Sequence, residues 1–332
     1  MNIIMLGSGA WGTALANLLC ENGHRVILWN KNPARAEEMA RSHRNPRLKD
    51  VELHPAMEFT SSLACARECC MAVFATPSFA IREAAAAVRP FLQENTILVS
   101  VTKGIEAKTG LRMTQIIEQE TGREASVLSG PSHAEEVSKG IPTGCVAACR
   151  DIVVAEIIQE TFMNDVFRVY ASTDVVGVEL SAAMKNVIAL CAGISDGLGM
   201  GDNTKALLVT RGLTELARLV VAMGGHAETI AGLAGVGDMI VTCTSMHSRN
   251  RRAGILIGQG LPVAEAMEQV GAVVEGYYAA LSAWQLSCAA GVEMPICQQA
   301  HAVLYENKPA ADAIRELMRR GKKQEFEDAG WS

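Results

Sequence analysis

The stretch Gly7-Ser8-Gly9-Ala10-Trp11-Gly12 decides the fold of the first half of the chain. It follows an apolar segment, Ile3–Leu6, and opens a helical pattern over Trp11–Glu21. A second strand pattern, Arg25–Trp29, completes the unit within about 30 residues. In this context Gly7 permits a tight turn, Gly9 lets a pyrophosphate approach the backbone, and Gly12 lets helix and strand pack closely. The motif therefore predicts a dinucleotide site at a helix N-terminus, and glycines that serve only a turn are the alternative.

Short strand and helix patterns alternate up to about residue 175. The sequence predicts further strands at Met71–Ala75, Thr96–Thr102, Ala125–Leu128, Gly144–Ala148 and Phe167–Tyr170. Helices are predicted between them at Phe79–Phe91, Arg112–Glu120 and Ile152–Met163, and longer helical patterns follow near residues 177–192, 204–223, 263–268, 277–289 and 310–319. Such alternation predicts a parallel sheet with helices on both faces. We therefore expect an α/β, Rossmann-like doubly wound NAD(P)-binding domain over residues 1–180, followed by a mostly α-helical substrate and catalytic domain over residues 181–332.

Composition limits the class of protein. A length of 332 residues favours two domains, and a net charge of −6 argues against nucleic acid or an anionic membrane surface as a partner. No uncharged apolar run reaches about 18 residues, so we expect no membrane span. The ten cysteines form no C-x-x-C pair and the chain has no H-E-x-x-H motif, which favours reduced thiols in a cytoplasmic protein without a metal site.

The end of the second predicted strand bears on the choice of cofactor. An NAD-selective site usually has an acidic residue there to bind the ribose hydroxyls. This chain has Trp29-Asn30-Lys31-Asn32, followed by Arg35. A cation without an acid favours NADP(H), with NAD(H) as a second possibility, because the extra phosphate needs a positive partner. A solvated lysine is the alternative reading of Lys31.

Two charged residues stand alone in uncharged surroundings. Lys185 is the only charged residue between Leu180 and Ile194, and Asp238 is the only one between residues 229 and 248. Because a helix that is apolar on nearly all faces is buried, we expect Lys185 to be buried. Desolvation lowers the pKa of a lysine, which suits proton transfer to a substrate oxygen. A lysine that reaches the surface and an aspartate that caps a helix are the alternatives.

Lys103 and a cluster of arginines are further candidates for binding a ligand. Lys103 follows the predicted strand Thr96–Thr102, and the carboxyl ends of such strands line the ligand crevice of an open α/β sheet. Ser248-Arg249-Asn250-Arg251-Arg252 follows about twenty residues with almost no charge. Arginine forks with neutral donors suit a phosphate group. An exposed loop lysine and a solvated helix start are the respective alternatives.

These residues together resemble the bacterial-type NAD(P)-dependent glycerol-3-phosphate dehydrogenases, nearly from end to end. The matching stretches are Gly7–Ala16, Val101–Glu106, Leu128–Ala134, Glu179–Val187, Asp202–Ala206, Gly235–Asp238 with Thr242-Cys243, Ser248–Asn250 and Glu275-Gly276. This chain has Ala10-Trp11 where many relatives have Ser-Trp, which removes one hydroxyl. The segment 45–50 resembles the family's Tyr-Leu-Pro region only loosely, and this departure concerns the loop and not the chemistry.

The resemblance implies reversible hydride transfer at C2 between dihydroxyacetone phosphate and sn-glycerol 3-phosphate, which supplies the backbone of glycerophospholipids. It implies Lys185 as the proton donor in reduction and Lys103 as a group that holds and polarises the substrate, and we add the hypothesis that Asp238 orients the ammonium of Lys185. The implied substrate-binding residues are Lys103, Gly130, Ser132, Lys185, Asp238, Ser248, Arg249 and Asn250. The implied cofactor-binding residues are Ala10, Trp11, Lys31, Lys103, Ala134, Arg249, Val273 and Glu275, together with the glycines Gly7, Gly9 and Gly12.

Two other functions fit parts of the sequence. A β-hydroxyacid or 6-phosphogluconate type of dehydrogenase also joins a dinucleotide domain to a helical domain and uses a lysine, but the Gly-Val-Gly-Asp and Ser-Arg-Asn stretches favour the glycerol phosphate enzyme. A regulator that binds NADP(H) without chemistry would be expected to lose Lys185. A homodimer is the default assembly for an enzyme of this size.

Overall fold

The computed structural model describes residues 1–325 and divides the chain into two compact units. The first comprises residues 1–103 and 111–175, and the second comprises residues 104–110 and the chain from Val176 onward. The division coincides with the start of helix α7 (Val175–Gly197), a few residues before the predicted boundary at 180. Residue 332, the end of the predicted second domain, lies outside the described residues.

An eight-stranded sheet in the order β10-β9-β8-β7-β6-β1-β2-β5 forms the centre of the first unit. The strands are β1 (Asn2–Leu6), β2 (Arg25–Trp29), β5 (Glu58–Thr60), β6 (Met71–Phe74), β7 (Ile97–Ser100), β8 (Ala125–Ser129), β9 (Thr143–Ala148) and β10 (Phe167–Ser172). Every predicted strand is confirmed within a few residues. The three-residue edge strand β5 and the hairpin of β3 (Arg44–Asn45) and β4 (Leu48–Glu52) were not predicted.

One strand pair departs from the predicted parallel sheet. β8 and β9 are antiparallel, whereas the other neighbouring strands of this sheet are parallel. A parallel pair needs a crossover, usually made by a full helix. The connection between β8 and β9 contains only the four-residue helix α5 (Ala134–Val137), and the chain returns beside β8 in the opposite direction.

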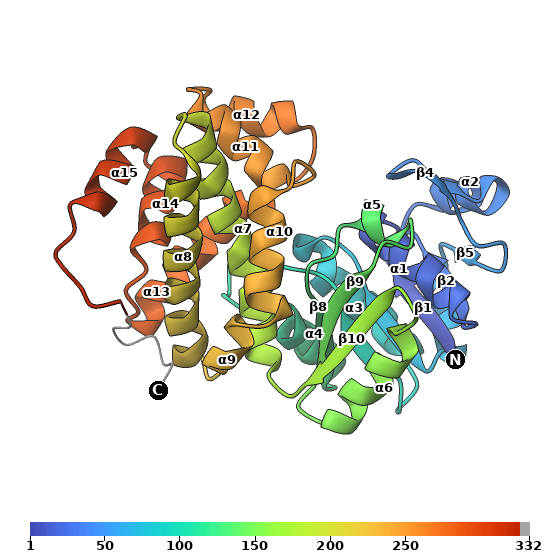
Figure 1. Cartoon of the computed structure of the whole chain (residues 1–332). Helices are drawn as coiled ribbons and strands as arrows, with labels where there is room; N and C mark the ends of the chain where they lie inside the picture. The colour runs from blue at the N-terminus through green and yellow to red at the C-terminus, as the bar shows by residue number, and fades with distance from the viewer. Residues whose placement is uncertain (326–332) are drawn as a thin grey trace. The chain divides into compact units, whose positions relative to one another are not determined.

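Alternate residues of β1 enter separate cores on the two faces of the sheet. Ile3 and Met5 pack with helices α1 (Ala10–Glu21) and α6 (Ile152–Phe162). Ile4 and Leu6 pack with α3 (Ile81–Val88) and α4 (Met113–Thr121). Figure 1 shows helices on both sides of the sheet. The sheet is therefore buried on both faces, as the apolar strand sequences predict.

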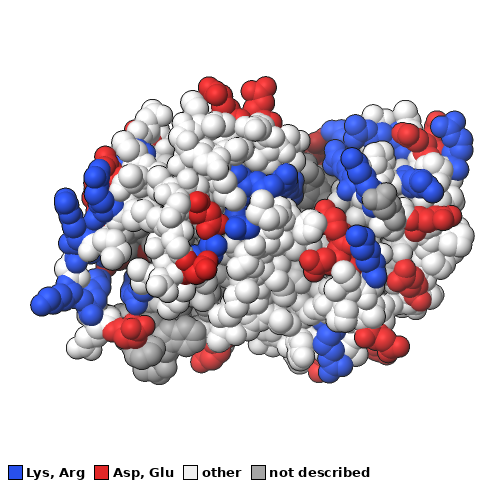
Figure 2. Space-filling model, turned by 45° about the horizontal axis from the view of Figure 1, so that its top comes forward, with Lys and Arg blue, Asp and Glu red and all other residues white. Residues whose placement is uncertain are grey.

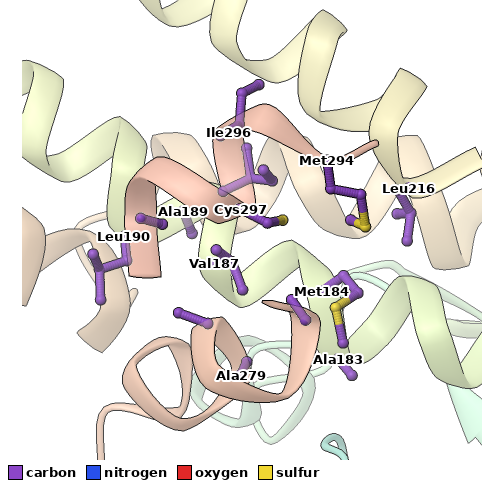
Figure 3. Close-up of a cluster of buried hydrophobic side chains, with 14 of the residues drawn as sticks. Ala183, Met184, Val187, Ala189, Leu190, Leu216, Ala279, Met294, Ile296 and Cys297 are labelled. Carbon is purple, nitrogen blue, oxygen red and sulfur yellow. The ribbon is translucent and has the colours of Figure 1, made fainter. Parts of the chain in front are cut away.

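The second unit is helical in the residues that the structure describes. After α7 come α8 (Asp202–Ala222), α9 (Ala227–Ile230), α10 (Asp238–Thr244), α11 (Arg249–Gly258), α12 (Val263–Val270), α13 (Glu275–Ala290), α14 (Pro295–Tyr305) and α15 (Ala310–Met318). In Figure 3, Val187 of α7, Ala279 of α13 and Cys297 of α14 point into one apolar cluster. By length and composition α7 could cross a bilayer, but 89% of its apolar window is buried, so its role as the central core helix accounts for its apolarity.

Helices α7 and α11 meet through two pairs of glycines. Gly193 and Gly197 lie one turn apart on α7, and Gly254 and Gly258 lie one turn apart on α11. A β-carbon at Gly193 would lie 2.1 Å from the carbonyl oxygen of Arg251, and one at Gly254 would lie 2.1 Å from that of Leu190. Because no side chain fits, the two backbones approach more closely than other residues would permit.

A buried carboxylate joins α8 to α14. The carboxylate of Glu215, which is 3% exposed, accepts hydrogen bonds from the backbone N–H groups of Ile296 (2.7 Å) and Cys297 (3.2 Å) in the first turn of α14. These bonds cap the helix, but burial outweighs them and raises the pKa of Glu215 to about 7.

The raised pKa predicts a pH dependence of stability. Between about pH 4.5 and 7 the carboxyl is ionised when unfolded and protonated when folded, so its contribution to the free energy of unfolding falls as the pH rises. Glu215→Gln removes this titration. Between pH 5 and pH 8 the free energy of unfolding of the wild type should fall by up to about 3 kcal/mol relative to that of the variant. Urea unfolding at each pH measures this difference. The exposed Glu265→Gln is the control, and a pH-independent difference for Glu215→Gln would contradict the prediction.

Candidate active site

The glycine loop of the first unit has the geometry of a phosphate cradle. Gly7 has a φ of +120°, and a β-carbon there would lie 2.7 Å from the carbonyl oxygen of Ala75. A β-carbon at Gly12 would lie 2.3 Å from the carbonyl oxygen of Gly7. At Gly9, the N-cap of α1, no atom of the described residues lies within 4 Å of such a β-carbon. Open space in front of a helix N-terminus fits a pyrophosphate, so the residues fit a dinucleotide cofactor.

Side-chain amides hold this loop in place. Asn30 at the end of β2 donates to the hydroxyl of Ser8 (2.5 Å). The buried Asn45 of the β3–β4 hairpin donates to the carbonyl oxygen of Ser8 (3.0 Å) and to the hydroxyl of Thr13 (2.7 Å). The loosely matching segment 45–50 thus begins with a residue that fixes the loop.

Lys31 forms an exposed ion pair. Its ammonium lies 2.5 Å from the carboxylate of Glu83 on α3, and the two side chains are 71% and 66% exposed. An ion pair this exposed contributes little to stability. No acidic residue stands at the end of β2, where Asn30 and Lys31 follow Trp29.

Three residues of the predicted substrate set meet in the first unit. The ammonium of Lys103 (3.0 Å) and the hydroxyl of Ser132 (2.9 Å) both donate to the carbonyl oxygen of Gly130. A β-carbon at Gly130 would lie 2.8 Å from the carbonyl oxygen of Gly144, so the β8 end packs directly on β9. Ala134, of the predicted cofactor set, begins α5 just beyond.

Lys185 forms the polar centre of the second unit. The residue is 6% exposed and Asp238 is 1% exposed, so the predicted burial is confirmed. The ammonium pairs with the carboxylate of Asp238 and donates to the hydroxyl of Thr242 (2.7 Å). Thr242 donates in turn to the backbone carbonyl of Asp238 (2.6 Å). A buried ammonium with two oxygen partners is held in one orientation.

A tight glycine turn presents Asp238 to Lys185. The π-helical turn Leu233–Gly237 precedes α10, and a β-carbon at Gly235 would lie 2.0 Å from the carbonyl oxygen of Ile230. Gly237, not Asp238, is the N-cap of α10. The aspartate therefore points its carboxylate at Lys185 and does not cap the helix.

A second network starts at the residue after Lys185. Asn186 donates to the carboxylate of Glu275 (3.1 Å) and accepts from the amide of Asn250 (2.9 Å). Asn250 accepts from the backbone N–H of Gly276 (2.8 Å). Asn186 and Thr242 were not predicted as site residues, although both lie in stretches that match the family.

The serine and arginines that precede and open α11 have different surroundings. Ser248 is the N-cap and accepts from the backbone N–H of Arg251 (3.2 Å). Arg249 and Arg252 are exposed, whereas the guanidinium of Arg251 is engaged within the unit, with Asp196 and Thr244. Val273, of the predicted cofactor set, is 43% exposed two residues before Glu275.

Charged side chains occur in groups on the surface (Figure 2). Figure 2 shows acidic and basic side chains next to one another in several groups on the face drawn, with broad uncharged areas between these groups. Among residues 1–325 no group of three or more histidine, cysteine, aspartate or glutamate side chains could hold a metal ion. The ten cysteines are free thiols, and Cys288 is the exposed one.

Comparison with known proteins gives the same family along the whole chain. The family model described as the N-terminus of NAD-dependent glycerol-3-phosphate dehydrogenase matches residues 2–155, and the C-terminal model matches residues 174–315. A glycerol-3-phosphate dehydrogenase (NAD(P)+) of Moorella thermoacetica is 46% identical over 99% of both chains. That of Fusobacterium nucleatum is 49% identical over 98% of this chain and 99% of its own.

Solved structures agree. A crystal structure of glycerol-3-phosphate dehydrogenase from Coxiella burnetii matches with a TM-score of 0.91 at 36% identity, over 96% of this chain and 99% of that one. D-mandelate dehydrogenase matches with a TM-score of 0.64 at 13% identity, over 95% of this chain and 99% of that one, which shows a shared fold alone. From the two family models and the full-length relatives, the chain belongs to the NAD(P)-dependent glycerol-3-phosphate dehydrogenases.

Proposed function

We propose that the chain reduces dihydroxyacetone phosphate to sn-glycerol 3-phosphate, reversibly, with a nicotinamide cofactor. The observation that carries the proposal is the buried Lys185 ammonium, held by Asp238 and Thr242 in a chain of this family. The product would supply the backbone for glycerophospholipid synthesis. The β-hydroxyacid type and the non-catalytic regulator have no observation in their favour here.

Lys185 is the proposed proton donor. When bound, the reduced nicotinamide supplies the hydride to C2. As charge develops on the carbonyl oxygen, the ammonium of Lys185 stabilises it and then gives up a proton. The ion pair with Asp238 favours the charged, proton-bearing form and fixes its direction, and Thr242 holds the same nitrogen from a second side. In the oxidation direction the neutral amine accepts the proton.

The proposed substrate residues include neutral donors and cations. In the second unit they are Ser248, Arg249 and Asn250 at the first turn of α11, where backbone N–H groups and an arginine fork suit a phosphate. In the first unit they are Lys103, Gly130 and Ser132, which are already joined through one carbonyl oxygen. Asp238 acts through Lys185.

The proposed cofactor residues lie in both units. The loop residues Gly7, Gly9 and Gly12 and the first α1 residues Ala10 and Trp11 would receive the pyrophosphate. Lys31 would pair with a ribose phosphate, and we therefore propose a preference for NADP(H) over NAD(H). The remaining members of the set are Lys103, Ala134, Arg249, Val273 and Glu275. We also propose that the enzyme works in the cytoplasm as a homodimer.

Replacing Lys185 tests the proton donor. Lys185→Met keeps the side-chain volume but removes the ammonium, and we expect kcat for dihydroxyacetone phosphate to fall by about 100-fold to 10,000-fold. The measurement is NADPH oxidation followed by absorbance. The exposed Lys108→Met is the matched control and should retain activity. Near-normal turnover by a folded Lys185→Met would refute the role, and no turnover by the wild type would refute the substrate.

Replacing Lys31 tests the cofactor preference. Lys31→Ala should lower kcat/KM for NADPH about 5-fold to 10-fold and leave the value for NADH nearly unchanged, since only NADPH carries the extra phosphate. Glu83→Gln, which removes the partner of Lys31, should move the ratio slightly towards NADPH. If the ratio of kcat/KM for NADPH to kcat/KM for NADH is the same in the wild type and in Lys31→Ala, the extra phosphate of NADPH is bound elsewhere.

The assembly can be measured directly. Light scattering of the purified protein should give twice the chain mass of 35.4 kDa across micromolar concentrations. A mass equal to one chain at every concentration would contradict the homodimer.

A further inference from the structure

One acidic residue of α7 holds two cations from different helices. Asp196 lies about three turns beyond Lys185 on α7. One carboxylate oxygen lies 2.9 Å from the ammonium of Lys205 on α8. The other lies 2.9 Å from Nε and 2.8 Å from an Nη of Arg251 on α11. We call Asp196, Lys205 and Arg251 the ionic cluster.

The ionic cluster is largely removed from water. The side chains of Asp196, Lys205 and Arg251 are 16%, 18% and 14% exposed. Charges at this depth are weakly screened. Removing Asp196 would leave Lys205 with only the fully exposed Asp202, 3.8 Å away, and would take from Arg251 the carboxylate that it contacts. A surface ion pair such as Asp312–Arg315, with side chains 41% and 66% exposed, lacks this property.

Arg251 connects the cluster to the segments that carry the proposed chemistry. Its guanidinium also donates to the carbonyl oxygen of Thr244 (2.8 Å), the last residue of α10, which bears Asp238 and Thr242. Its backbone N–H donates to the hydroxyl of Ser248 (3.2 Å). One side chain therefore ties the C-terminal part of α7 and the end of α10 to the first turn of α11.

The close packing of α7 on α11 makes this tie stiff. The carbonyl oxygen of Arg251 lies against Gly193, and that of Ile255 lies 2.2 Å from a β-carbon built at Gly197. Asp196 lies between these two glycines in the sequence. The charge contact thus fixes α11 at the place where its backbone already touches α7.

We infer that Asp196 is a positioning residue for the phosphate of the substrate. The ionic cluster sets where Ser248, Arg249 and Asn250 lie relative to Lys185, and so determines whether a bound phosphorylated substrate presents its carbonyl to the ammonium. This inference rests on the proposed function. It also accounts for Lys205, which lies in a stretch that matches the family, and for Arg251, which directly follows one; the proposed reaction does not otherwise use either residue.

The test compares a phosphorylated with an unphosphorylated substrate. Asp196→Asn removes the charge and keeps the shape. We expect KM for dihydroxyacetone phosphate to rise about 10-fold to 100-fold, with kcat within about 3-fold of the wild type. Turnover of dihydroxyacetone, which lacks the phosphate, should change by less than about 2-fold. The Kd for NADPH should rise by less than the KM for dihydroxyacetone phosphate, because Arg249 is the one proposed cofactor residue in the displaced segment.

Two further variants keep the test decisive. Asp312→Asn, a carboxylate-to-amide change in the exposed pair on α15, should leave all four quantities unchanged. Arg251→Lys keeps the charge but loses the fork that reaches both Asp196 and Thr244, and it should repeat the pattern of Asp196→Asn. If circular dichroism shows that Asp196→Asn does not fold, Arg251→Lys takes its place in the comparison of the two substrates.

The outcomes separate the two proposals. A wild type that does not reduce dihydroxyacetone phosphate overturns the proposed function and, with it, the substrate assumed here. If the wild type does reduce it, two results overturn the positioning role alone. One is that the variants lose activity on both substrates in parallel, and the other is that they keep a normal KM for dihydroxyacetone phosphate. A selective rise in KM for the phosphorylated substrate supports it.

Discussion

The contact between α7 and α11 is the constraint on which the second unit depends. Two pairs of glycines let carbonyl oxygens of one helix lie where side chains of the other would be. α7 carries Lys185 and Asn186, and α11 carries Asn250. A larger residue at any of the four glycines would push the helices apart and would change the distance between the proposed proton donor and the proposed phosphate site. The glycines are therefore a means of setting a distance between functional groups.

The polar groups of this unit are arranged around that contact, and each has compensation nearby. Lys185 has Asp238 and Thr242, and Arg251 has Asp196 and the end of α10. Burying such charges gains little stability compared with apolar side chains of the same volume. What it provides is a single orientation for groups that react or bind, since an alternative packing would leave a buried charge unpaired.

The sequence predicts those features that depend on neighbours along the chain. Apolar runs such as Ile3–Leu6 identify the buried strands, and a lone charge in an apolar helix identifies Lys185 as buried. Helix α2 (Pro33–Ser42) was missed because it is short, polar and rich in charges, and β9 was expected to be parallel because nothing in its own sequence reports direction.

The partners of the buried charges could not be predicted either: Asp238 lies 53 residues from Lys185, and Asp196 lies 55 from Arg251. Only the folded chain shows that Arg251 serves an internal contact while its neighbour Arg249 is exposed.

The proposed anion sites of the two units depend on different physical features. The first offers backbone N–H groups and an open space at Gly9, secured by the amides of Asn30 and Asn45, so its weakness is steric: an added β-carbon at Gly7 or Gly12 collides with main-chain atoms. The second offers side chains whose direction is set by buried charges, so it is sensitive to the loss of a charge as well as to bulk at the contact of α7 and α11. A backbone cradle tolerates changes of charge around it, whereas a side-chain site tolerates changes of volume only where the ionic contacts persist. Added bulk at the close glycine contacts should therefore disturb both units, whereas the removal of a buried charge should disturb mainly the second.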